Sequence, residues 1–91
     1  MSDATTNEAL LAELRAEYAP ELAAELDRLL LAIGDGAPEA RRSAHRIAGT
    51  SGSYGFDAIG ALVRRIEQAL AAGAAVDPVI LAELRALRRA L

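Results

Sequence analysis

The chain has 91 residues, a formal net charge of −3 and no cysteine. This length suits one small domain, the negative charge argues against nucleic-acid binding through phosphate contacts, and the lack of cysteine excludes disulfides and thiolate chemistry. Hydrophobic residues make up 53% of the chain but only three residues are aromatic, a composition that favours closely packed helices over a sheet. No apolar run approaches the roughly 20 residues of a membrane span, so we expect a cytoplasmic protein.

The first third of the chain predicts two helices that are separated at Pro20. Thr5 followed by Glu8 fits a capping box at the start of a short helix over residues 7–18. Proline disfavours the α conformation in the residue before it, so we expect a break or kink and then a second helix over residues 20–33. The apolar stripe of this second helix is Leu22, Leu26, Leu29, Leu30 and Ile33.

Three further helices are predicted after the turn Gly34-Asp35-Gly36, over residues 38–54, over residues 58–72 with Asp57 as its cap, and from the N-cap Asp77 to the end. Short loops between successive helices imply antiparallel neighbours. We therefore predict an all-α fold, an antiparallel up-and-down four-helix bundle with a short extra N-terminal helix. The inward stripes are Ala40, Ala44, Ile47, Ser51 and Tyr54, then Ile59, Leu62, Val63, Ile66 and Leu70, then Ile80, Leu81, Leu84, Leu87 and Leu91.

His45 is the only histidine, and glycines follow it after four, seven and ten residues. A glycine inside a helix costs up to about 1 kcal/mol relative to alanine, so Gly49 and Gly52 need a reason. They lie one and two turns beyond His45 on the same helix face, where missing side chains uncover the imidazole. His45 is about 100° from the inward stripe, so we expect its ring to be open to water.

The segment from Ala44 to Gly55 resembles the motif of histidine-containing phosphotransfer (HPt) domains. That motif is a helical histidine, an apolar residue two positions later, usually lysine at three, glycine at four, small residues, and another glycine at ten. Ile47, Gly49 and Gly55 match it, whereas Ala48 stands in place of the usual lysine. Residues 54–56 are also similar to the version in chemotaxis histidine kinases, and the resemblance at motif level covers about residues 41–70.

The resemblance implies one HPt-like helical domain over residues 1–91, of which we expect residues 1–4 to be a frayed tail. It also implies a monomeric phosphocarrier of bacterial two-component phosphorelays. His45 would accept a phosphoryl group from a receiver-domain aspartate, of a response regulator or a hybrid histidine kinase, and pass it to another receiver. The partner would supply Mg²⁺, and the chain needs no cofactor of its own. We identify no metal site and no ATP site, and therefore expect no enzyme.

Several side chains near His45 are candidates for facing the phosphoryl group or the partner. The chain contains no lysine, so an arginine would have to replace the one missing at Ala48. Arg41, Arg42 and Arg46 are on the same helix, and a solvated basic face is an equal interpretation. Related domains often place a polar residue of the next helix near the histidine, and the sequence does not decide between Glu67 and Gln68. Exposed polar residues without a function are the simpler interpretation of both. Gly52 has a second interpretation as a site of close helix packing.

Four other functions compete with the phosphocarrier. A docking module that regulates receivers or kinases without carrying phosphate is kept open by Ala48. A phosphotransfer domain of a chemotaxis-type kinase would take its phosphoryl group from an ATP-bound kinase domain, although Met1 and the absence of a trailing linker favour a complete short protein. A structural bundle could associate through the leucine-rich last helix. Small-molecule catalysis ranks last, because no acid–base pair is apparent.

Overall fold

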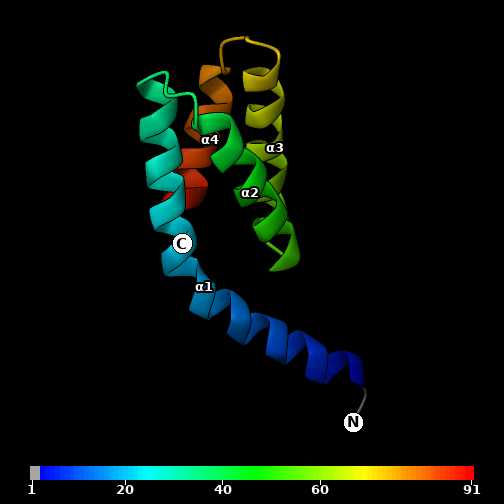
Figure 1. The fold of residues 1–91 in the computed structure, drawn as a ribbon. Coiled ribbons are helices and arrows are strands. Elements are labelled where there is room, and N and C mark those ends of the chain that lie inside the picture. Colours follow the sequence, from blue (N-terminus) through cyan, green and yellow to red (C-terminus); the bar gives the residue numbers. More distant parts are fainter. Residues whose placement is uncertain (1–2) are drawn as a thin grey trace.

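The computed structural model describes residues 3–91, and all regular secondary structure within that range is helical. The predicted all-α class is therefore confirmed. In Figure 1 the colours advance upward along the first and third helices and downward along the second and fourth. The helices are α1 (Asp3–Gly34), α2 (Ala40–Ser53), α3 (Asp57–Ala71) and α4 (Pro78–Arg89).

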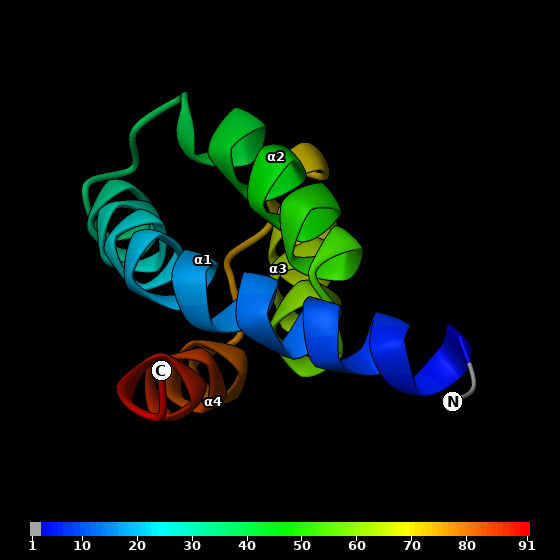
Figure 2. The ribbon, with the colours of Figure 1, turned by 90° about the horizontal axis from the view of Figure 1, so that it is seen from below.

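The four helices form a bundle in which each helix contacts two neighbours. α2 lies against α1 and α3, α4 closes the ring against the other sides of α1 and α3, and α2 and α4 occupy opposite corners (Figure 2). Within the described range no helix is long and apolar enough to cross a membrane.

α1 is one continuous helix through Pro20, so the predicted separate N-terminal helix is wrong. Proline removes one backbone hydrogen bond and crowds the carbonyl four residues earlier, which bends a helix without ending it when the flanking residues are good helix formers. Figure 1 shows this bend where α1 passes from blue to cyan. Beyond it the N-terminal half of α1 leaves the bundle, and Leu10 and Leu14 are exposed.

The start of α1 also differs from the expectation. Residues 1–2 of the predicted frayed tail lie outside the described residues, whereas Asp3 and Ala4 belong to α1. Because the helix already includes Asp3, Thr5 is inside it and does not occupy an N-cap position. The predicted capping box is therefore wrong.

The core is built from the predicted apolar stripes. Full burial of a Leu or Ile side chain stabilises a fold by roughly 1.5–3 kcal/mol, so these stripes supply most of the driving force for packing. Alanines on the inward face of α2 keep that helix close to its neighbours. The stripe residues toward the helix ends are only partly buried, among them Tyr54, Leu70, Leu81, Leu87 and Leu91. The largest side chains with almost no exposure are Leu22, Leu26, Leu29, Ile47, Val63, Ile66 and Leu84, together with Ser51.

Glycine-containing turns end the helices and set where α2 and α3 start. Gly55 has a φ of +81°, and the N–H of Phe56 donates to the carbonyl of Ser51 at 2.8 Å, a Schellman motif that ends α2. α2 begins at Ala40, two residues later than predicted, and Asp57 lies in the first turn of α3 where a cap was expected. The predicted cap of α4 is confirmed, since the Asp77 carboxylate accepts from the N–H of Val79 at 2.8 Å.

Candidate functional site

His45 projects from α2 into solvent, and its side chain is 79% exposed. The residues on either side of it along the inward face, Ala44 and Ile47, are fully buried. Burial of these neighbours fixes the helix backbone that carries the imidazole, while the ring itself stays open to an approaching molecule. The histidine therefore combines a fixed attachment with an accessible ring.

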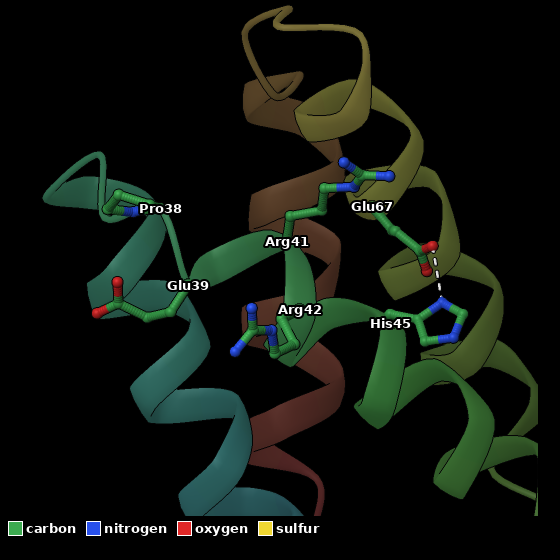
Figure 3. Close-up of a pocket in the computed structure, with 6 residues that line it drawn as sticks. All are labelled: Pro38, Glu39, Arg41, Arg42, His45 and Glu67. Atoms are coloured by element: carbon green, nitrogen blue, oxygen red, sulfur yellow. Dashed lines mark hydrogen bonds and ion pairs between the residues drawn. The ribbon is translucent and has the colours of Figure 1, made fainter.

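One carboxylate of α3 orients that ring. Nδ1 of His45 lies 2.9 Å from Oε1 of Glu67, whose side chain is only 24% exposed (Figure 3). A carboxylate accepts hydrogen bonds, so Nδ1 carries the proton in the neutral ring and Nε2 keeps its lone pair. Glu67 follows the fully buried Ile66, which anchors this part of α3 in the core. Of the two candidates, Glu67 and not Gln68 makes the contact with His45.

Two hollows flank the paired His45 and Glu67. The larger, about 680 Å³, lies toward the start of α2, where Arg41 and Arg42 border it (Figure 3). The smaller, about 330 Å³, lies toward Gly49. The larger hollow is lined by Pro38, Glu39, Arg41, Arg42, His45 and Glu67, and the smaller by His45, Ala48, Gly49, Arg64, Glu67 and Gln68.

The sequence-predicted residues divide into those that gather around His45 and those that do not. Arg46 and Gly52 line neither hollow, although both are exposed. Ala48 borders the smaller hollow but is only 3% exposed and belongs to the core, so the expectation that it faces a partner is corrected. Its methyl group packs between α2 and its neighbours because it lies next to Ile47 on the inward face. The predicted residues that gather around His45 are Arg41, Arg42, Gly49, Glu67 and Gln68, together with the largely buried Ala48.

The two glycines after His45 are surrounded by open space. A Cβ atom added at Gly49 or Gly52 would meet nothing within 4 Å, so helix packing does not require a glycine at either position. The interpretation of Gly52 as a packing residue is therefore wrong. The close approach of the two helices instead occurs at Gly60 of α3, where an added Cβ would lie 3.6 Å from the carbonyl oxygen of Ala48.

Arg64 is the basic residue near His45 that the sequence reasoning missed, and Pro38 and Glu39 of the larger hollow were not predicted either. Arg64 precedes Glu67 by three positions and Gln68 by four, and helical residues at these separations share a face. Helical spacing from Glu67 and Gln68 is thus the sequence signal that points to Arg64. Elsewhere, no cluster of three or more potential metal ligands occurs among the residues that the structure describes.

A family model described as the Hpt domain matches residues 8–91 of the chain. The chain belongs to the Hpt domain family. Hpt domains are phosphocarrier modules that take part in histidine phosphotransfer in phosphorelays, where they interact with receiver domains and kinases. No curated protein and no solved structure matches the chain.

Proposed function

We propose that this Hpt domain carries a phosphoryl group on Nε2 of His45 between receiver-domain aspartates. The observation that supports the proposal best is the state of the ring: it is 79% exposed, and Glu67 binds its Nδ1. A ring held in this way presents one nitrogen lone pair to solvent, and the open space above Gly49 lets a second protein approach it.

The transfer step follows from this geometry. The Nε2 lone pair attacks the phosphorus of an aspartyl phosphate, the N–P bond forms, and the P–O bond to the aspartate breaks. The electron pair of that bond leaves with the carboxylate. No proton has to be lost, because the ring takes a positive charge that the neighbouring Glu67 carboxylate stabilises across 2.9 Å. The reverse step returns the group to the carboxylate of another receiver.

The charges around His45 suit an anionic reacting group. Arg41 and Arg42 border one side of the paired His45 and Glu67, and Arg64 borders the other. Phosphoryl transfer passes through a loose transition state, so positioning and charge stabilisation account for most of the catalysis. In this proposal the receiver supplies Mg²⁺ and the Hpt domain contributes the imidazole and a docking surface. The monomeric state and the cytoplasmic location remain predictions.

A relay experiment tests the proposal. A receiver domain phosphorylated on aspartate is mixed with the chain and Mg²⁺, the donor is removed, and a second receiver is added. We expect the label to move to the chain and then to the second receiver. If several receivers leave the chain unlabelled while a chemotaxis-type kinase with ATP labels it, the donor is a kinase domain. If neither labels it, the proposal fails and the docking module replaces it.

A further inference from the structure

We propose that the guanidinium of Arg64 binds the phosphoryl oxygens on His45. It would take the place of the lysine that is missing at Ala48. This inference rests on the proposed function and adds to it the residue that contacts the transferred group. Arg64 is on α3, whereas the arginines considered from the sequence are all on α2.

Arg64 lies on the side of His45 that Nε2 faces. α2 and α3 run in opposite directions in Figure 1, so one turn before Glu67 on α3 corresponds to one turn after His45 on α2. Arg64 and Gly49 occupy these two places and line the same hollow of about 330 Å³. Figure 3 shows Nε2 on the side of the ring opposite Glu67 and Arg41. The reactive nitrogen therefore faces away from the hollow of Arg41 and Arg42.

The availability of Arg64 is the second argument. Its side chain is exposed and forms no ion pair with any residue whose side chain the structure describes. Glu67, the acidic residue on the same helix face, is already bound to His45. The preceding residue, Val63, is fully buried and fixes the helix at this point. An incoming phosphoryl group thus meets a guanidinium that forms no ion pair with a described side chain.

The space around Arg64 is the third argument. The two α2 residues on its side of His45 are Ala48, whose side chain is a methyl group, and Gly49, which has no side chain. A guanidinium from α3 therefore reaches toward Nε2 without meeting a long α2 side chain. Its planar fork donates two N–H groups to a pair of phosphoryl oxygens and so stabilises the negative charge that these oxygens carry during transfer. A cation from α3 can therefore bind the phosphoryl group at the place where α2 has only small residues.

The test measures the rate of His45 labelling against the concentration of a receiver domain phosphorylated on aspartate. Arg64→Ala and Arg64→Gln should lower the maximal rate by about tenfold or more, because a charged hydrogen-bond donor is lost. The receiver concentration that gives half the maximal rate should change by less than about twofold, since exposed single charges contribute little to docking. Arg64→Lys should recover part of the rate. Arg65→Ala, which removes the neighbouring arginine from another face of α3, is the matched control and should behave like the wild type.

The outcomes separate the inference from the proposed function. If the wild type accepts no phosphoryl group from any receiver or kinase, both fail. If the wild type is labelled and both neutral Arg64 variants keep its maximal rate, the inference fails and the proposed function stands. A rise in the half-saturating receiver concentration alone would also overturn it, because Arg64 would then be a docking residue. Far-UV circular dichroism and thermal melting confirm that each variant is folded.

Discussion

Glu67 of α3 holds Nδ1 of His45 of α2 at 2.9 Å, and this hydrogen bond connects two helices through side chains 22 positions apart. The bond selects the ring nitrogen that stays free, because a carboxylate pairs only with the protonated one. It also ties the ring orientation to α3, where Ile66, the residue directly before Glu67, is fully buried. The reactivity of His45 therefore depends on the packing of α2 against α3.

Replacing Glu67 should slow phosphotransfer without unfolding the bundle. In Glu67→Gln the amide keeps the size of the side chain but removes the negative charge that stabilises the phosphorylated ring, and its NH2 group can also donate to Nδ1 and so favour the tautomer that protonates Nε2. We expect the maximal transfer rate to fall roughly tenfold, the cost of losing a charged hydrogen-bond partner. Gln68→Ala is the matched control, because Gln68 borders the smaller hollow beside Glu67 but forms no hydrogen bond with His45. Equal rates for the two variants would show that the hydrogen bond has no part in transfer.

Side chains at Gly49 should obstruct the partner while stabilising the helix. An added Cβ meets nothing within 4 Å, so Gly49→Ala should raise the free energy of unfolding by about 0.5–1 kcal/mol, the difference in helix propensity. Gly49→Leu should reduce transfer from a receiver strongly while the protein stays folded. Gly34→Leu adds the same side chain at another open position, at the end of α1, and should not affect transfer. Normal transfer by Gly49→Leu would contradict this explanation of the glycine.

Gly55 should be the least replaceable of the glycines near the site. Its φ of +81° costs an L-residue about 1–2 kcal/mol, and an added Cβ would lie 3.2 Å from the guanidinium of Arg15. Gly55→Ala should therefore lower the unfolding free energy by about that amount in urea titrations. Gly60→Ala is the comparison, since its Cβ would make only ordinary contacts at 3.6 Å, and it should be close to neutral. The reverse order of stabilities would refute this reading of the α2–α3 turn.

We expect the free energy of unfolding to fall at high pH because of Tyr18. Burial, followed by the negative charge of Glu25, raises the pKa of Tyr18 from 10.0 to about 12, and its hydroxyl donates to Glu25 at 3.2 Å. The folded protein thus keeps the phenol proton between these two pH values while the unfolded chain loses it. The resulting stabilisation is complete below pH 10 and disappears as the pH rises toward 12.

Urea unfolding at a series of pH values measures this loss. Tyr18→Phe keeps a ring that can stack on Tyr54, 4.5 Å away between centroids, but has no proton to lose. Its unfolding free energy should therefore fall less steeply above pH 10 than that of the wild type. Parallel pH profiles for the two proteins would rule out Tyr18 as the source.

The sequence predicts those features that depend on spacing within one helix. Leu22, Leu26 and Leu29 recur at helical intervals, and all three are buried as expected. The prediction failed at Pro20, because the loss of one hydrogen bond was too small to end a helix whose flanks favour it. Local sequence patterns do not show whether such a proline breaks a helix or only bends it.

Features that depend on the register between two helices could not be predicted. The choice between Glu67 and Gln68 requires knowing how α3 is rotated against α2, and an error of one residue exchanges them. The same register turns Gly60 toward the backbone of α2, whereas a Cβ added at Gly52 would meet nothing within 4 Å. The spacing of Arg64 to Glu67 puts both on one face of α3, but the missing lysine at Ala48 points first to arginines on the helix of the histidine.

The chemical state of His45 after exposure to a phosphorylated receiver tests most directly whether this residue carries the phosphoryl group. The wild type and His45→Gln are incubated with the phosphorylated receiver and Mg²⁺ and then followed by intact mass. We expect a phosphoryl adduct on the wild type alone, labile in acid and stable in alkali, with equal helicity and melting for both proteins. An adduct on both proteins, or one that is stable in acid, would contradict the central role of His45.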